Sequence, residues 1–484
     1  MSLNPSHPPL SHLDIRTIVI GVGVAMFLGA LDQTIIAAAL PAIAADLGDF
    51  NAISWVASIY LLTATAVTPL YGKYSDIKGR RAALTLGITL FVAGSVACAL
   101  APTMSWLIAA RALQGLGGGG LISLAQTIVA DIVAPKERGR YQIYFASVFL
   151  LASLLGPTLG GVFTQHLHWT LIFWINLPLG ALAYFISSAA LKRLPRHDRP
   201  HELDLLGAGL LVAATVSLML ALHDGGTTYA WDSPRTGGLL GASAALWILF
   251  VWRIRWAREP LIPLSVLGNK VVSRATVAAS CGMGAYIGLS IYLPVYFQSA
   301  RGLSISASGL GLIPLMVGTV VGATIAGQLM GRIVHYKRIP TIGLCVATMG
   351  AIILTFWADQ LPLTAFEAVL ALISVGLGTV LPTTTVAIQN AVQLHELGTA
   401  TGTMNFFRQL GSAVTVAIFG ALLNASEVGG ETISATAGVP PGAFRSIFAA
   451  TAIGFAIAFV FILWMKERPL RSSARHAAEA TILD

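Results

Sequence analysis

Charged residues are scarce in this chain. They make up 10% of the 484 residues, whereas soluble domains carry roughly 25%. Hydrophobic residues account for 56%, and the mean hydropathy is +0.77. This composition excludes an ordinary soluble domain and predicts an all-α, polytopic membrane protein. The net charge of +8 does not indicate a nucleic-acid partner, because the basic residues lie in short segments between apolar runs.

Cysteine is also rare. The three cysteines, Cys98, Cys281 and Cys345, lie in different apolar runs, and their spacing matches no metal or redox motif. No histidine, cysteine and acid come together within the apolar runs, so we predict no metal site, no cofactor and no enzymatic activity. The first apolar run is too long for a removable signal peptide and lacks a small-residue cleavage site, and we expect it to remain as a helix.

Long apolar runs dominate what is present. A window of about 20 residues finds fourteen candidate spans. When alternate connections are placed on opposite sides, 24 of the 29 lysines and arginines fall on the side of the N-terminus. Three fall on the other side, Arg235, Arg301 and Arg445. Because cytoplasmic loops collect basic residues, this bias predicts an even number of helices and two cytoplasmic termini.

Two longer basic loops, 191–200 and 253–270, divide the spans into groups of six, two and six. We therefore predict an N-terminal bundle at 15–192, two additional helices at 204–256 and a C-terminal bundle at 271–465. Spans four and twelve share glycine pairs, Gly115 with Gly117 and Gly376 with Gly378, as expected of two pseudo-symmetric halves. We expect the two additional helices to lie outside this core and not to line a central cavity.

Asp32 is a carboxylate deep within an apolar span, where an ionisable group is costly and usually functional. At about 1.5 Å per residue, Asp32 lies roughly 22 Å from the inner face and Arg111 about 9 Å from the outer face. In a core about 30 Å thick these depths coincide. We predict that the two side chains interact if spans one and four face each other. The alternatives are that Asp32 binds a cationic ligand directly, or that the ion pair is purely structural.

The loop between spans two and three has a mixed pattern of glycine, acid and base. Gly72 and Gly79 allow a tight connection, and Asp76 is placed to face the positive end of a neighbouring helix. Arg80 can then reach Asp131, at the end of span four. We predict that these charged residues form a cluster, with a solvated basic loop as the alternative.

Several motifs resemble those of the major facilitator superfamily. They are Gly72–Arg81, Arg111–Gly118 and Gly156–Gly161, and together with Leu31–Thr34 and Ile175–Gly180 the pattern resembles its fourteen-helix drug/proton antiporters over about residues 15–465. Two features depart from that family: Thr170 and Leu171 replace an arginine and a tryptophan, and span thirteen has Arg408 but no acid.

The resemblance implies a proton-driven antiporter that exports amphipathic drugs from a bacterial cell across the inner membrane. It implies that Asp32 carries the proton, that Arg111 tunes it, and that the loop 2–3 cluster latches the halves in the outward-facing state. One deep acid favours monovalent cationic or neutral cargo. An exporter of a metabolite, siderophore or lipid is the alternative within the same fold, and a transport-incompetent membrane sensor is another. We expect a monomer surrounded by lipid.

Small residues recur on one face of span five at Ala152, Gly156 and Gly160, near Pro157 and Gly161. Span ten has Gly318, Gly322, Gly327 and Gly331, and we predict that these two faces pack together and seal the inner side. Ordinary packing is the alternative. We expect Tyr296 to be an interfacial anchor. The substrate-binding candidates are Gln33, Gln114, Tyr286, Tyr292, Asn405, Phe406 and Arg408.

Overall fold

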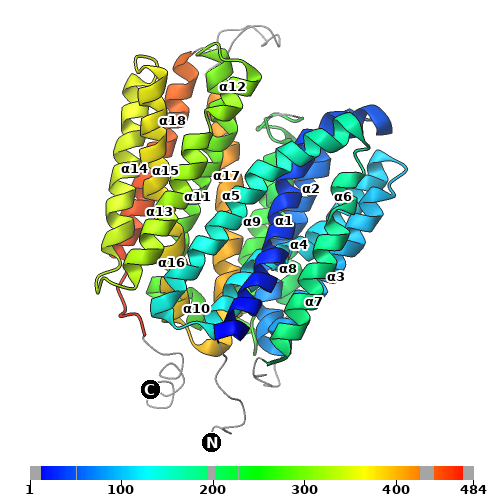
Figure 1. Cartoon of the computed structure of the whole chain (residues 1–484), viewed down its shortest axis with the longest axis vertical. Helices are drawn as coiled ribbons and strands as arrows, with labels where there is room; N and C mark the ends of the chain where they lie inside the picture. Colours follow the sequence, from blue (N-terminus) through cyan, green and yellow to red (C-terminus); the bar gives the residue numbers. More distant parts are fainter. Residues whose placement is uncertain (1–11, 51, 194–201, 227, 426–440, 472–484) are drawn as a thin grey trace, which may run out of the picture.

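The computed structural model describes residues 12–50, 52–193, 202–226, 228–425 and 441–471. These residues contain 14 helices long and apolar enough to cross a membrane, which confirms the spans predicted from the sequence. Helices suit a membrane because each satisfies its backbone polar groups internally. Figure 1 shows two bundles, with the start of the first helix and the end of the last at one end of the molecule. We call this end the terminal face and the opposite end the distal face.

The first bundle contains six spans. Its helices are α1 (His12–Leu47), α2 (Ile53–Lys78), α3 (Arg80–Ala99), α4 (Met104–Ile132), α5 (Pro135–His166) and, as one span, α6 (Leu171–Trp174) with α7 (Asn176–Ala190), followed by a 3-10 turn at Leu191–Arg193. Two more spans follow, α8 (Leu205–Asp224) and α9 (Pro234–Trp256). Most of the predicted basic loop at 191–200 lies outside the described residues.

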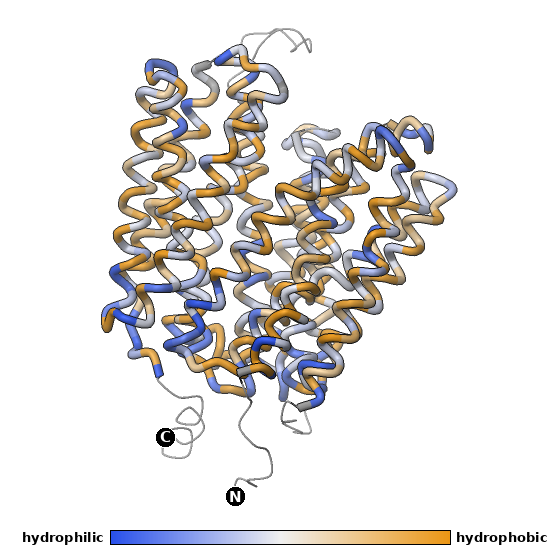
Figure 2. The backbone as a smooth tube through the Cα atoms, in the orientation of Figure 1, coloured by the Kyte–Doolittle hydropathy of each residue, from blue (hydrophilic) through white to orange (hydrophobic). Residues whose placement is uncertain are grey.

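The second bundle also contains six spans. Its helices are α10 (Leu264–Leu267), α11 (Lys270–Ser299), α12 (Ile305–Leu310) with α13 (Ile313–Met330), α14 (Arg338–Trp357), α15 (Leu363–Gly378) with α16 (Val380–Ala391), the 3-10 turn Leu394–Glu396, α17 (Leu397–Ala425) and α18 (Pro441–Trp464). Figure 2 shows apolar residues along the spans and hydrophilic residues gathered at the two ends.

The two bundles are built on the same plan. α1 packs on α5 and α7, as α11 packs on α17 and α18, and α4 packs on α2 and α3, as α15 packs on α13 and α14. The shared glycines have equivalent positions in this plan. A Cβ on Gly117 would lie 2.3 Å from the backbone nitrogen of Phe91 on α3, and one on Gly376 would lie 2.1 Å from the carbonyl oxygen of Gly343 on α14. The halves are therefore structural repeats.

The bundles meet through matching helices. α2 packs on α17 and α5 packs on α13, so the second span of each half contacts the fifth span of the other. α5 and α13 approach each other closely at Gly139 and Gly327, near the terminal face. A Cβ on Gly327 would lie 2.3 Å from the carbonyl oxygen of Gly139.

The prediction of which residues make this contact was mostly wrong. Gly156 and Gly160 pack instead against Thr34 and Ile35 of α1, inside the first bundle. Gly318 and Gly322 likewise pack against α15. Periodicity predicts that a helix has a face of small residues. However, α5 and α13 each pack closely on two neighbouring helices, and either contact requires such a face. Spacing alone does not say which neighbour receives which face.

We expect Gly327→Ala to destabilise the protein, because main-chain atoms of α5 occupy the position of the new methyl group. Overpacking of this kind costs about 1–3 kcal/mol. Gly161→Ala is the control, since a Cβ on Gly161 meets no atom within 4 Å. The measurement is the unfolding midpoint of the purified protein, followed by tryptophan fluorescence. The first variant should melt several degrees lower than the control, and equal midpoints would contradict the assigned contact.

The additional helices pack on one another and against the junction of the bundles. α8 contacts α2 and α17. On α9, the ring of Trp247 lies 6.1 Å from that of Phe406 on α17. The other side of α9 exposes Trp252 and Trp256, at 60% and 72%, as expected of a surface facing lipid. The pair lies outside the repeated plan of the two bundles, and Figure 1 shows it between them.

Candidate functional site

Asp32 lies buried in the first bundle, with 1% of its surface exposed. Its Oδ2 accepts a hydrogen bond from Arg111 Nη1 on α4 at 2.6 Å, and its Oδ1 accepts one from Gln114 Nε2 at 2.8 Å. The predicted contact between Asp32 and Arg111 is therefore present. Hydrogen bonds of this length between a guanidinium and a carboxyl group are among the strong ones in proteins.

The rest of the first bundle holds Arg111 and Gln114 in place. Arg111 Nε donates to the carbonyl oxygen of Val56 on α2 at 3.0 Å, and its guanidinium lies 4.4 Å from the centre of the Tyr60 ring. Gln114 Nε2 also donates to Ser95 Oγ on α3, which in turn accepts from Asn176 on α7. Residues of five helices, α1, α2, α3, α4 and α7, thus meet around one ion pair.

Three consecutive residues of α1 point to three different neighbours. Asp32 faces α4, as described. Gln33 is exposed and lines the central cavity. Thr34 faces α5, where its Oγ1 donates to the carbonyl oxygen of Ala152 at 2.8 Å. Successive helix residues point about 100° apart, which explains the three directions. α1 therefore connects the buried ion pair, the cavity and the α5 glycine face.

Asp76 joins the two bundles at the terminal face. It accepts hydrogen bonds from the backbone N–H groups of Gly398 and Thr399, at 3.0 and 2.7 Å, in the first turn of α17. The Thr399 hydroxyl also donates to it, at 2.7 Å. The positive end of a helix dipole and free N–H groups together favour a carboxylate. The prediction that Asp76 faces such a helix end agrees with this geometry.

Arg80 holds Asp76 from the other side. Its Nη1 lies 2.5 Å from Asp76 Oδ1, and its Nε lies 2.6 Å from Asp131 Oδ2 on α4. The connection that places Arg80 turns at Gly79, whose φ of 90° is in the region that favours glycine. Gly72 allows α2 and α17 to approach closely, since a Cβ there would lie 2.4 Å from the carbonyl oxygen of Gly398.

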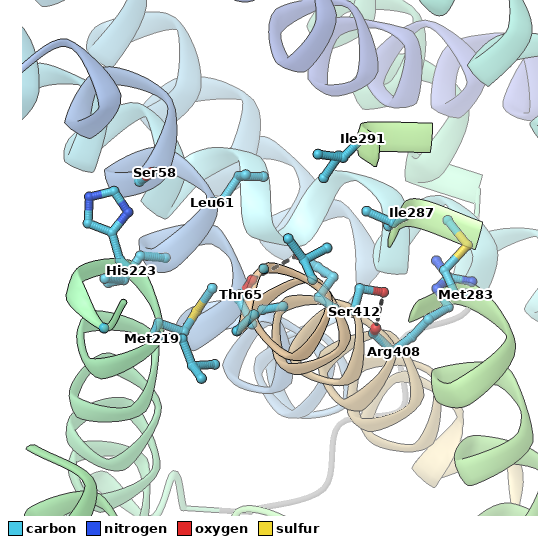
Figure 3. A pocket seen from close by; sticks show the side chains of 18 of the residues that line it. Ser58, Leu61, Thr65, Met219, His223, Met283, Ile287, Ile291, Arg408 and Ser412 are labelled. Atoms are coloured by element: carbon cyan, nitrogen blue, oxygen red, sulfur yellow. Dashed lines mark hydrogen bonds between the residues drawn. The ribbon is translucent and has the colours of Figure 1, made fainter. Parts of the chain in front are cut away.

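A cavity of about 490 Å³ lies between the bundles, a size typical of small-molecule sites. It runs from Trp55, in the first turn of α2 at the distal face, to Arg408, near the middle of α17. Figure 3 shows Leu61, Ile287 and Ile291 among its apolar lining residues and Thr65, Arg408 and Ser412 among its polar ones. Such a wall suits a molecule with an apolar body and a polar group.

α8 forms part of the cavity wall, contrary to the prediction that neither additional helix would. Met219 and His223 line the cavity, and the His223 ring packs edge-on against Trp55 of α2 at 4.5 Å (Figure 3). No described residue of α9 lines it. The order of spans along the chain did not predict where α8 packs. With six, two and six spans, the extra pair can pack on either side of the junction between the bundles.

Three of the predicted substrate-binding residues line the cavity, namely Gln33, Tyr292 and Arg408. The other four do not. Gln114 belongs to the Asp32 cluster, and Tyr286 packs against the core of the second bundle. Asn405 is buried between the bundles, and Phe406 is buried against α9. Polar and aromatic residues also occur in buried contacts between helices. Residue type alone therefore did not distinguish a residue that lines the cavity from one buried between helices.

Other residues near the site were not predicted or were predicted differently. Asn405 Nδ2 donates to Gln126 Oε1 on α4 at 2.8 Å, which is a hydrogen bond between the bundles. Thr65 of α2 makes a similar link to Gln409 of α17 at 3.1 Å. Polar residues within apolar helices were the available signal. Tyr296, expected at the membrane interface, is 1% exposed and donates its hydroxyl hydrogen to Asp359.

Two repeated helical bundles around a central cavity, with a buried ion pair beside it, define a membrane transporter rather than an enzyme. The family model of the Major Facilitator Superfamily matches residues 22–416, and the chain belongs to that superfamily.

Curated relatives are similar over most of their length. The multidrug transporter protein MdtP of Bacillus subtilis (strain 168) is 34% identical over 414 residues, covering 85% of this chain and 76% of the relative. Multidrug resistance protein 3 of the same organism is 34% identical over 405 residues, covering 84% and 79%. The efflux pump dotC of Dothistroma septosporum (strain NZE10 / CBS 128990) is 33% identical, covering 83% and 70%.

Solved structures share the fold. The human organic anion transporter MFSD10 superposes with a TM-score of 0.67 at 18% identity, covering 93% of this chain and 99% of that chain. The proton:xylose symporter XylE superposes with a TM-score of 0.65 at 13% identity, covering 95% and 98%. At these identities the likeness establishes the architecture alone.

Proposed function

We propose that this protein is a proton-driven efflux antiporter that exports amphipathic small molecules across a bacterial inner membrane. The observation that carries the proposal is the buried pair of Asp32 and Arg111, next in sequence to Gln33, which faces the cavity. A titratable pair beside a substrate-sized cavity is what coupling requires. The names of the relatives, multidrug transporters and efflux pumps, support the direction and the breadth of transport.

The proposed orientation places the terminal face in the cytoplasm, because most of the basic residues lie in the segments on that side. The contacts of Asp76 then close the cytoplasmic side, while the cavity reaches toward the outer face at Trp55. We propose that the protein acts as a monomer, and that this is an outward-facing state. We assign Gly72, Asp76, Gly79, Arg80 and Asp131 to the latch that stabilises it.

In the proposed cycle Asp32 binds a proton from outside and releases it inside. Movement of Arg111 away from Asp32 and back, breaking and restoring the 2.6 Å contact, is the proposed switch between uptake and release of this proton. One deep acid suggests one proton per cycle. A charge that crosses 100 mV supplies about 2.3 kcal/mol, equivalent to a concentration ratio of about 40 at ~1.4 kcal/mol per tenfold.

The α5 motif has a proposed role in transmitting this change. Gly156 and Gly160 let α5 lie directly against Thr34 and Ile35 of α1. A shift of α1 that accompanies protonation of Asp32 would therefore move α5, and α5 contacts the other bundle at Gly327. Pro157 is exposed, and Gly161 has open space beside it, so these two residues shape the helix rather than the contact.

Transport by purified protein in liposomes tests the proposal. The experiment follows a panel of amphipathic dyes and of polar metabolites, with and without an imposed pH gradient. We expect several dyes to be concentrated against their gradient only when the pH gradient is present. Transport of one metabolite and no dye would support a specific exporter instead. Dye uptake at the same rate with and without the pH gradient would contradict proton coupling. Export of antibiotics would link the protein to antibiotic resistance.

A further inference from the structure

Arg408 is a cation near the middle of the membrane. It lies 11 residues after the start of α17, or about 16 Å at 1.5 Å per residue, in a core about 30 Å thick. Its Nη2 donates to Asn405 Oδ1 at 2.6 Å. No acidic side chain within the described ranges forms an ion pair with it. A guanidinium at this depth is costly, and such groups are retained where they bind something.

The charge of the cavity has one sign. Among the described residues that line it, Arg408 carries the fixed charge and none is aspartate or glutamate. His223, at the distal end, is the other group that can become positive. Asp32 does not compensate, because it is 1% exposed and both of its oxygens are occupied by Arg111 and Gln114. A cationic guest would therefore meet a positive group and no carboxylate.

We propose that the cavity binds amphipathic organic anions, whose carboxylate or sulfonate pairs with the guanidinium of Arg408. This inference rests on the proposed export function, and it reverses the charge expected from the sequence, which was cationic or neutral. Figure 3 places Arg408 beside Met283 and Ser412, with Ile287 and Ile291 further along the same wall. An anionic group at Arg408 leaves an apolar body against these isoleucines. A planar guanidinium pairs well with such a group through two parallel hydrogen bonds.

Equilibrium binding to the purified, full-length protein tests this without a pH gradient. Three fluorescent probes share one naphthalene body and one alkyl linker, and end in a sulfonate, a hydroxyl or a quaternary ammonium. The variants are Arg408→Gln, which removes the charge, and Arg408→Lys, which keeps it. Arg445→Gln is the control, because Arg445 lies on α18 at the distal face and stacks on Phe356 outside the cavity.

We expect the wild-type protein to bind the sulfonate at least tenfold more tightly than the ammonium probe. Arg408→Gln should weaken sulfonate binding at least tenfold and change hydroxyl binding less than threefold. Arg408→Lys should keep most of the sulfonate affinity, and Arg445→Gln all of it. Equal or tighter binding of the ammonium probe by the wild type would overturn the inference. An equal loss for all three probes in Arg408→Gln would also overturn it, as would an unchanged sulfonate affinity.

These results separate the inference from the proposed function. Selective sulfonate binding without pH-driven transport would support the anion site and refute proton coupling. Transport driven by the pH gradient without a preference for the sulfonate would leave the exporter standing and refute the anion site.

Discussion

Asp32→Asn is expected to abolish accumulation driven by a pH gradient, reducing it to the level of protein-free liposomes. The asparagine amide has nearly the same shape, so it can still accept a hydrogen bond from Arg111 at the position of Oδ2. It cannot bind and release a proton in the physiological range. The measurement is dye transport into liposomes with an imposed pH gradient, beside exchange of dye without a gradient. Exchange should persist, because the cavity is intact.

A purely structural ion pair would give a different result. Breaking a buried pair from one side costs about 3–5 kcal/mol, because the remaining charge stays buried. The double variant Asp32→Asn with Arg111→Gln removes both charges, so it should melt above the single variant if that cost is large. We expect the double variant to remain inactive in pH-driven transport even if its stability recovers. Recovery of transport together with stability would assign Asp32 a structural role only.

Asp76→Asn is expected to lower transport at least tenfold while folded protein remains in the membrane. The carboxylate accepts four hydrogen bonds, three of them from Gly398 and Thr399 of the other bundle. An asparagine would turn an NH₂ group toward donors on one side. Each buried donor left without an acceptor costs about 1–3 kcal/mol, and 1.4 kcal/mol changes a population ratio tenfold. The conformation in which the terminal face is closed should therefore become much less populated.

Asp131→Asn is the matched control. Asp131 also contacts Arg80, at 2.6 Å, but it lies on α4 within the same bundle as Arg80. Its loss should weaken the placement of Arg80 without removing a link between bundles, and we expect a smaller loss of transport than in Asp76→Asn. Distances between spin labels that replace the exposed residues Arg140 and Arg332 report opening of the terminal face. Equal opening in both variants would contradict the role given to Asp76.

The span count was predictable from the sequence because a membrane requires about 20 apolar residues per helix whatever their packing. The contact between Asp32 and Arg111 was predictable for a related reason, since helix rise converts position into depth. Depth does not fix rotation about the helix axis. The contact of α5 with α13 was therefore assigned to Gly156 and Gly160 rather than to Gly139, and α8 was excluded from the cavity that it lines.

The cavity was the least predictable part of the site. Tyr292 and Arg408 face it, but Tyr286 and Asn405, each separated from one of them by less than two turns of the same helix, do not. Whether a polar side chain is available to a guest depends on the neighbouring helix that covers it. The sign of the cavity charge depends on this too, because Asp32 is buried against Arg111 and Gln114 of α4 and does not line the cavity. Gln114 itself was predicted to bind substrate.

The three directions taken by Asp32, Gln33 and Thr34 constrain how α1 can evolve. Each side chain could be exchanged for another without disturbing the other two. A gain or loss of one residue anywhere between the terminal face and Asp32 would instead rotate all three by about 100° against partners that stay in place. Asp32 would lose its hydrogen bond from Arg111, and Thr34 would lose its hydrogen bond to Ala152. The length of this segment is therefore restricted independently of its composition, and insertions or deletions are better tolerated in the connections than in the first half of α1.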